Sequence, residues 1–528
     1  MDELPEQKKS FFRRELVYLA VVLIVAIISG VIVILQFTSP TKTLKGADYV
    51  ENLPKEQVRV GVSSYITGLY PLMELEVDSL TVSSNIFEGL TIIRNGRLIP
   101  GLAESWTNPD ELAWRIKLRS GVKFHSGEAL KASDVKYSIE EAKKNQDWTS
   151  NFVAARVDSV EVINDQTVEL KTKSPDPTLL HWFIYVGILS EGQVKKDGLD
   201  KAVGAGPYKL VSFDKKEVVL EANASYWAGA PKVKRLIYKQ FDDDKALAAA
   251  LKAGQLDMSL LNTDSANEEL ENEGFQVVTS RLMDINYIGV NLSKDPFKNV
   301  KVRKAVWLAL DIPNLLKNSS VAGEALSQVA TPELIGYNTA LPKPKQDLQK
   351  AKQLLTEAGL PNGFSFTLDV PLPRKAAAEE IKKQLAKVGM TVKLNVSNDP
   401  EEEFARWASG DYSSYTIGYL PDTLDSTDLL ETLFHTPTER KGYSNFGVYS
   451  DTDLDNMLDE AGNTFNPKER ADIIKQTHKK VIEELPIIPL YTRVGFFVMK
   501  EDIAFKPAPF GYIFGFEISG RQKATETQ

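Results

Sequence analysis

The sequence predicts an α/β protein with mixed sheets, preceded by a segment that can cross a membrane. Residues 364–370 and 391–396 alternate apolar and polar residues, as half-buried strands do, and residues 375–388 between them have apolar side chains at helical spacing. Such a strand-helix-strand unit normally closes as a right-handed parallel crossover. A length of 528 residues allows about three or four folding units, or two large lobes.

The N-terminal part of the chain is predicted to be a membrane anchor. Residues 16–35 carry no charge, and about 20 helical residues at 1.5 Å each span roughly 30 Å of hydrocarbon. Two lysines and two arginines lie in residues 1–15, which makes that segment a cytoplasmic tail and residues 16–35 an uncleaved signal anchor. A buried core helix is the alternative. The polar residues 36–55, which include two prolines, are predicted to form a linker.

The composition excludes several classes of function. The chain has 63 Lys+Arg against 72 Asp+Glu, a formal charge of -9, and no basic block that could hold a phosphate backbone. Nucleic acid is therefore not an expected partner. The absence of cysteine excludes disulfides, thiolate metal sites, cysteine nucleophiles and an acylated lipoprotein cysteine. The fold outside the membrane must then be held by packing alone.

Other elements are indicated by capping residues. Residues 58–62 read as a buried strand, and Ser133 with the acid after it caps an amphipathic helix. Ser450 starts another helix in a looser version of the same chemistry. Asn466, followed by a proline and then an acid three residues on, caps a long helix that ends before Pro486.

Catalytic motifs are missing from the sequence. There is no G-x-S-x-G elbow, no G-x-x-x-x-G-K-[ST] phosphate loop and no H-E-x-x-H, so we predict neither an enzyme nor a bound cofactor. Gly204 and Gly206 are followed by proline and tyrosine, which breaks the dinucleotide fingerprint and favours a tight backbone passage instead.

Metal-binding patterns are equally weak, and no metal site is predicted. Asp451-x-Asp453-x-Asp455 resembles the start of a calcium loop, but the sixth position is not glycine and the twelfth is not an acid, so helix capping is favoured. The four histidines show no ligand spacing. A metal role stays open only for His435, because it lies in the segment that is assigned below to a cleft.

Several segments occur in the order typical of one transport family. They read SNIFEGLT at 84–91, PGLAESW at 100–106, LRSGVKFHSG at 118–127, ASDVKYS at 132–138, GAGPY at 204–208 and AALKAGQLD at 249–257. In these motifs the chain resembles the extracytoplasmic solute-binding proteins of ABC transporters, in the bacterial family 5 type that binds oligopeptides, dipeptides and nickel chelates.

The resemblance implies a two-lobed clamp of the periplasmic-binding-protein type II, with an extra subdomain inserted in lobe one. Its implied boundaries are 56–80, 202–281 and 486–528 for lobe one, 81–201 for the inserted subdomain and 282–485 for lobe two. The chain would cross between the lobes near Arg281 and Pro486, and such a paired crossover is a natural hinge. Closure around a solute would create the shape that permease subunits in the membrane recognise.

The resemblance also implies where the solute is held. The segment 418–425, GYLPDTLD, is similar to the family's G-W-x-x-D-x-x-D-P, whose first aspartate pairs with a peptide's α-ammonium. Asp422 would then bind the ligand's cationic end, with Tyr419 packing on its backbone and Asp425 close by. The alternative is that both acids cap a turn.

Two further segments are similar to parts of the family's cleft. Asn445 and Phe446 stand in a segment like N-F-S-x-Y, and Tyr491 lies where a cleft tyrosine is expected, although all three could equally belong to the core. The sequence therefore predicts a monomeric, membrane-anchored protein that captures oligopeptides or dipeptides for an ABC importer. The alternatives are a nickel chelate, opine or sugar as solute, or an enzyme or sensor domain on the same scaffold.

Overall fold

The computed structural model describes residues 49–523, with gaps. The gaps are residues 64–65, 67, 71, 73–76, 95, 145–148, 199–200, 202, 215, 264–265 and 439–440. All described residues belong to one compact unit, Lys45–Gln528. The predicted tail at 1–15 and membrane span at 16–35 lie outside the described residues. Among the helices that are described, none combines the length and the apolar character that a membrane crossing requires.

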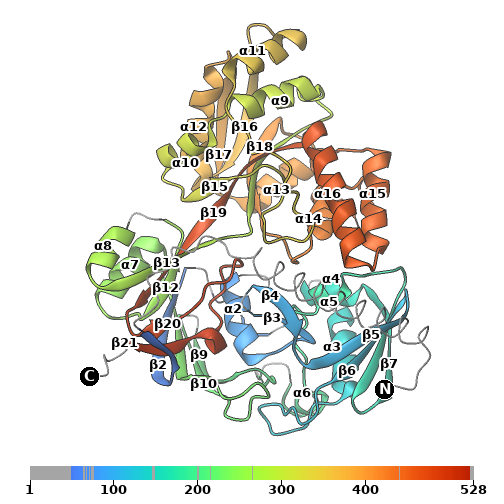
Figure 1. Cartoon of the computed structure of the whole chain (residues 1–528), viewed down its shortest axis with the longest axis vertical. Helices are drawn as coiled ribbons and strands as arrows, with labels where there is room; N and C mark the ends of the chain where they lie inside the picture. Colours follow the sequence, from blue (N-terminus) through green and yellow to red (C-terminus); the bar gives the residue numbers. More distant parts are fainter. Residues whose placement is uncertain are drawn as a thin grey trace, which may run out of the picture. The chain divides into compact units, whose positions relative to one another are not determined.

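A large mixed sheet extends through the described part of the chain (Figure 1). Its strands run in the order β17-β16-β18-β14-β19-β12-β2-β11-β10-β9, and β13 and β15 also pair with β19. Their bounds are β2 Lys55–Val62, β9 Tyr208–Asp214, β10 Glu217–Ala222, β11 Val233–Gln240, β12 Met258–Leu261, β13 Phe275–Arg281, β14 Ile285–Val290, β15 Gly323–Ala325, β16 Ser365–Pro371, β17 Thr391–Ser397, β18 Ser414–Tyr419 and β19 Ile487–Lys500.

The predicted strand-helix-strand unit is confirmed. β16 and β17 pair in parallel, from Ser365 opposite Thr391 to Pro371 opposite Ser397. The helix α12, Lys375–Ala386, connects them and buries the apolar face formed by Ala378, Ile381 and Leu385. The chain turns at Gly389, whose φ of 86° is a conformation that glycine adopts without strain. The predicted strand at 58–62 is likewise confirmed as the buried end of β2.

Lobe two carries the remaining helices of the second half of the chain. These are α9 Val300–Ala309, α10 Ile312–Ser319, α11 Leu348–Glu357, the 3-10 turn η1 Leu372–Arg374, α13 Pro400–Ala408, α14 Ser426–Phe434, α15 Thr452–Asn463 and α16 Pro467–Glu484. The predicted cap of α16 is confirmed, because the Asn466 side chain accepts hydrogen bonds from the backbone N–H groups of Lys468 and Glu469. The start of α15 is corrected. Its cap is Asp451, not Ser450, since the Asp451 carboxylate reaches the N–H of Leu454.

The inserted segment forms a small sheet of its own. Its elements are β3 Thr91–Arg94, β4 Arg97–Pro100, β5 Ala103–Asp110, β6 Ala113–Leu118, α3 Ala132–Lys144, α4 Thr149–Ala154, β7 Val157–Asn164, β8 Thr167–Thr172, α5 Leu179–Trp182 and α6 Glu191–Asp197. β3 and β4 make a hairpin, and β5-β6-β8-β7 make an antiparallel sheet. One continuous apolar cluster joins this sheet to β2 and β11 of lobe one, so the insert and lobe one share a core.

The backbone passage predicted at Gly204 and Gly206 is tight. A Cβ on Gly204 would stand 2.1 Å from the carbonyl oxygen of Ile86, and one on Gly206 would stand 2.6 Å from the same oxygen. Ile86 is the last residue of α2, Val77–Ile86. These two glycines therefore let the chain pass closely against the end of α2.

The linker predicted at 36–55 ends earlier than expected. Residues 49–53 form β1, Tyr49–Leu53, which pairs with β21, Ser519–Lys523, and β21 also pairs with β20, Ile503–Ala504. Tyr49 donates a hydrogen bond to Glu501 at 2.8 Å, and the Arg521 guanidinium lies 4.1 Å from its ring. These partners lie more than 450 residues further along the chain, which is why the local polarity of the segment did not reveal the strand.

β19 belongs to both lobes (Figure 1). Its first half, up to Arg493, pairs with β14 and β15 of lobe two, and its second half, from Val494, pairs with β12 and β13 of lobe one. The first crossover lies at 282–284, next to the predicted position. The second lies inside β19 and not at Pro486, which is buried in lobe two after the helix-ending Leu485.

Side chains connect the two crossovers directly. Arg493 Nε donates to the carboxylate of Asp284 at 2.6 Å, and the Thr492 hydroxyl donates to the carbonyl of Leu282 at 2.6 Å. Arg281 forms ion pairs with Glu333 at 2.6 Å and with Glu324 at 2.9 Å, both in lobe two. The predicted hinge residue Arg281 thus ties the end of β13 to the neighbouring lobe.

Candidate functional site

The site predicted around Asp422 lies in the loop between β18 and α14. β18 is an inner strand of the sheet, between β14 and β16, and it ends at Tyr419. The loop that follows carries Asp422 and reaches α14, whose first turn begins after the capping residue Asp425. Because β18 and α14 are both fixed by packing, the loop between them holds its polar side chains in a defined place.

Asp422 is a partly buried acid without a cationic partner among the described residues. The Tyr419 hydroxyl donates a hydrogen bond to its Oδ2 at 3.3 Å. Removal from water raises the pKa of Asp422 to about 6, and the hydrogen bond from Tyr419 opposes this shift. A carboxylate held this way favours a ligand that brings a positive charge and hydrogen-bond donors.

Asp425 has a different environment from Asp422. Its side chain is 0% exposed, its Oδ1 accepts from the N–H of Thr427 at 3.0 Å, and its Oδ2 pairs with Arg470 at 2.9 Å. Both oxygens are therefore occupied by the protein itself. The alternative that the two acids of this motif are capping residues holds for Asp425, which caps α14. Asp422 caps none of the described helices.

The other predicted site residues lie in well-packed parts of lobe two. Asn445 uses its amide to donate to the carbonyls of His435 and Tyr449, and its oxygen accepts from the Tyr449 N–H, so the group is fully engaged in a turn. Phe446 belongs to an aromatic cluster with Trp407 and Tyr415 at centroid distances of 6.2 and 6.1 Å.

Tyr491 lies on β19, where it is 4% exposed and packs in the core of lobe two. Burial raises its pKa, while the nearby Arg374 lowers it. No hydrogen bond or ring contact between described residues joins Tyr491, Asn445 or Phe446 to Asp422. The structure thus brings Tyr419 and Asp422 together and gives the other four predicted residues structural contacts.

A residue of the insert reaches the Asp422 loop. Tyr185 donates a hydrogen bond to the backbone carbonyl of Asp422 at 2.8 Å. Tyr185 also shares a side-chain hydrogen bond with Tyr512 from the C-terminal segment, and burial holds the pKa of both hydroxyls above the ordinary value. The loop that carries Asp422 is therefore in contact with lobe one and its insert.

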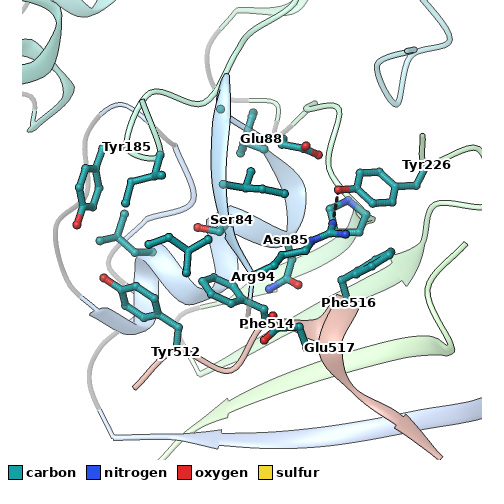
Figure 2. Close-up of a pocket in the computed structure, with 17 residues that line it drawn as sticks. Ser84, Asn85, Glu88, Arg94, Tyr185, Tyr226, Tyr512, Phe514, Phe516 and Glu517 are labelled. Atoms are coloured by element: carbon teal, nitrogen blue, oxygen red, sulfur yellow. Dashed lines mark hydrogen bonds between the residues drawn. The ribbon is translucent and has the colours of Figure 1, made fainter. Parts of the chain in front are cut away.

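Tyr185 and Tyr512 form one side of a pocket that is lined by both the insert and lobe one (Figure 2). The pocket encloses about 710 Å³, including the part that is open to solvent. Its walls are largely aromatic and aliphatic, with contributions from α2, the β3-β4 hairpin and the 3-10 turn η2, Gly515–Glu517. Figure 2 shows Arg94, Tyr226 and Phe516 on the opposite side from the two tyrosines.

The polar members of this pocket are held by their neighbours. Arg94 donates to the Tyr226 hydroxyl at 2.6 Å and lies 3.8 Å over the ring of Phe516. Trp227 donates to both carboxylate oxygens of Glu88, at 2.9 and 3.1 Å. Burial raises the pKa of Glu88 to about 7, although these hydrogen bonds and the charge of Arg94 lower it. The pocket therefore combines an apolar wall with an acid that titrates near neutrality.

Sequence reasoning did not single out Tyr185, Tyr512 or Glu88. Glu88 stands inside the family-like segment 84–91, which was used only to establish the resemblance. Tyr185 follows a run of aromatic and apolar residues at 181–184, a signal for burial that does not reveal a contact with residue 422.

The described residues hold no cluster of three or more His, Cys, Asp or Glu side chains that could bind a metal ion. Asp451, the first residue of the calcium-like pattern, caps α15. His435 Nδ1 lies 2.7 Å from the carbonyl of Thr436, and its Nε2 is 3.3 Å from Asp459.

This architecture defines a class of binding protein: two α/β lobes joined by paired crossovers, with a partly buried acid where one lobe meets the insert of the other. The family model for "Bacterial extracellular solute-binding proteins, family 5 Middle" matches residues 97–440, more than half of the chain. The chain therefore belongs to this family of solute-binding proteins, which serve ABC importers.

Relatives along most of the chain agree with this assignment. The chain is 28% identical over 500 residues to heme-binding protein A of Haemophilus influenzae, covering 86% of this chain and 91% of that protein. It is 26% identical over 472 residues to the glutathione-binding protein GsiB of Pectobacterium atrosepticum, covering 84% and 92%. Both relatives are named for the solute that they bind.

Solved structures show the same fold. HbpA2 from Haemophilus parasuis aligns with a TM-score of 0.79 at 25% identity, covering 88% of this chain and 100% of that one. The periplasmic binding protein DppA from Helicobacter pylori, in complex with the peptide STSA, aligns with a TM-score of 0.73 at 22% identity over 89% and 98%. NikZ from Campylobacter jejuni, in complex with Ni(L-His), aligns with a TM-score of 0.74 at 24% identity over 88% and 100%.

Proposed function

We propose that this protein captures short peptides for an ABC importer and binds the α-ammonium group of the peptide at Asp422. The observation that carries the proposal is the environment of that acid. Asp422 is partly buried, receives a hydrogen bond from Tyr419 and has no cationic partner among the described residues. An ammonium group would supply the missing charge and several donors, and a charge pair shielded from water is strongly directional.

The contacts of the Asp422 loop support capture by closure. Tyr185 of the insert bonds to the backbone of the residue whose carboxylate would hold the ligand. A ligand at Asp422 therefore lies beside a contact between lobe two and lobe one with its insert, and contacts to both lobes are what favour a closed state. The pocket beside Tyr185 and Tyr512 would take the apolar part of the ligand.

We further propose that residues 16–35 anchor the chain in the cell membrane, with the tail 1–15 inside and the binding lobes outside. The uncharged length of this segment and the positive charges before it support the proposal. The lobes would then work as a monomer close to the permease. Fractionation of cells that produce the full-length chain tests this, since an unanchored or cleaved protein would appear in the soluble extracytoplasmic fraction.

Calorimetric titration of the full-length chain with alanine tripeptide tests the proposed ligand. We expect binding by the unsubstituted chain and a loss of about 2 kcal/mol or more in Asp422→Asn, because that change removes the charge of a water-shielded pair. Glu460→Gln is a matched control, since Glu460 is an exposed acid on α15 of the same lobe. Equal affinities of Asp422→Asn and the unsubstituted chain would refute the role of Asp422.

Native mass spectrometry of protein purified without refolding identifies the solute class directly. A mass difference that corresponds to short peptides would support the proposal. A nickel chelate, an opine or a sugar in their place would keep the protein a solute carrier and would refute the peptide assignment.

A further inference from the structure

A second buried acid lies one helical turn beyond the Asp422 loop. Asp428 is the third residue of α14 and is 7% exposed. Its Oδ2 is enclosed by protein and has no hydrogen-bond partner among the described residues. Enclosing a carboxylate oxygen in this way is costly, so buried carboxylates normally have a partner.

The residues just before Asp428 show the same deficit. The hydroxyls of Ser426 and Thr427 are also enclosed without a hydrogen-bond partner within the described part of the chain. Three consecutive residues in the first turn of α14 therefore leave polar atoms unused, although the cap of this helix is complete through Asp425. Requirements of the helix itself do not explain these three side chains.

The negative charges of Asp422 and Asp428 both act on the Tyr419 hydroxyl. That hydroxyl donates to Asp422 Oδ2 at 3.3 Å. Burial raises the pKa of Tyr419, and the negative charges of Asp428 and Asp422 raise it further. A phenol has one O–H to donate and cannot serve both carboxylates, which leaves Asp428 without a donor from Tyr419.

The wider surroundings of Asp428 are more acidic than basic. Burial raises the pKa of Asp428 most, the charges of Asp422, Asp425 and Glu431 raise it further, and the charge of Arg156 lowers it. Asp425 is neutralised by Arg470 at 2.9 Å and Glu431 by Lys441 at 2.6 Å. Asp422 and Asp428 are the two acids of this group without an ion pair among the described residues.

Arg156 is already engaged on the insert side. Its Nε lies 3.4 Å from Asp176 Oδ2, and its guanidinium carbon lies 4.6 Å from the ring of Trp182. The remaining titratable neighbours are Tyr185 and Tyr443, whose pKa values Asp428 raises. Among the described residues, the ion pair of Arg156 is with Asp176 and not with Asp428.

We propose that the preferred ligand carries two cationic groups, one held at Asp422 and the second at Asp428, as in a peptide whose first or second residue is basic. This inference rests on the proposed function and specifies its ligand class. The α-ammonium group would pair with Asp422. The basic side chain would supply the donors that Asp428, Ser426 and Thr427 lack, and would remove the cost of two close, unpaired acids.

The inference predicts a difference between two peptides of similar shape. Calorimetric titration compares Lys-Ala-Ala with norleucine-Ala-Ala, in which an apolar chain replaces the lysine side chain. We expect the full-length chain to bind Lys-Ala-Ala roughly tenfold to hundredfold more tightly, as for a buried hydrogen bond between charged groups. Asp428→Asn should reduce this ratio to near one, whereas Glu460→Gln should leave it unchanged.

The outcomes separate this inference from the proposed function. Equal binding of both peptides by the unsubstituted chain, or an unchanged ratio in Asp428→Asn, would overturn the inference alone. Failure of both peptides to bind would overturn the peptide assignment and this inference with it. If Asp428→Asn does not fold, Asp428→Glu is the second variant. It keeps the negative charge, so it should retain a preference for Lys-Ala-Ala. Loss of that preference in Asp428→Glu would also count against the inference.

Discussion

The buried ion pair between Asp425 and Arg470 allows a quantitative test of how this lobe is stabilised. The two side chains are 0% and 5% exposed and meet at 2.9 Å. Asp425→Asn keeps an oxygen that can cap α14 but leaves the Arg470 guanidinium buried without a counter-charge. Breaking a buried pair in this way costs about 3–5 kcal/mol.

A matched pair elsewhere in the lobe serves as the control. Asp451 caps α15 and pairs with Lys480 at 3.0 Å, but these side chains are 26% and 25% exposed. The same change, Asp451→Asn, should therefore cost only about 0–1 kcal/mol. The two variants make the same chemical change at the same helix position and differ mainly in burial.

Urea unfolding of the full-length chain, followed by far-ultraviolet circular dichroism, measures both free energies. We expect Asp425→Asn to lose at least about 2 kcal/mol more than Asp451→Asn. Adding Arg470→Leu to Asp425→Asn should restore part of the loss, because it removes the unpaired buried charge. Equal losses in the two single variants would show that burial does not set the strength of these pairs and would refute the reasoning.

Three further predictions concern the site. Burial raises the pKa of Asp422 to about 6, so its neutral form stabilises the fold at low pH, and that stability is lost as pH rises through 6. The affinity for an ammonium ligand should behave in the opposite way and fall about tenfold per pH unit below about 6. Asp422→Asn should abolish this pH dependence of the affinity in calorimetry. Glu88→Gln should flatten the decline in thermal stability that the unsubstituted chain shows as pH rises through about 7, and parallel pH profiles would contradict the buried-acid assignment. Tyr185→Phe removes the hydrogen bond to Asp422 and should weaken tripeptide binding by about 0.5–1.5 kcal/mol, with a larger radius of gyration in small-angle scattering; an unchanged affinity and radius would contradict a role in closure.

Local elements could be predicted from the sequence because their causes are local. The cap at Asn466 and the strand-helix-strand unit at 364–396 depend on residues only a few positions apart, and both were found as expected. The strand at 49–53 depends on a partner near the C-terminus, and the second crossover lies inside a strand with no turn residue to mark it. These features follow from long-range pairing, which a local pattern does not contain.

The same distinction applies to the site. Tyr419 and Asp422 are three residues apart in one loop, so the sequence alone places them together. Tyr185, Tyr512 and Glu88 come from the insert, the C-terminal segment and the segment between α2 and β3, and only the fold assembles them. For Asp425 the local sequence is misleading. Its pattern resembles a binding motif, but its carboxylate is paired with the buried Arg470, which lies 45 residues further along the chain.

The continuity of β19 restricts how this protein can open. One strand of 14 residues is hydrogen-bonded into the sheets of both lobes, without a loop between its two halves. Sliding or wide separation of the lobes would have to break ladder bonds, whereas a change in the twist of the strand near 492–494 would preserve them. Any opening should therefore be a rotation that twists β19 and bends the neighbouring connection at 282–284, while the ladder bonds of both lobes stay intact.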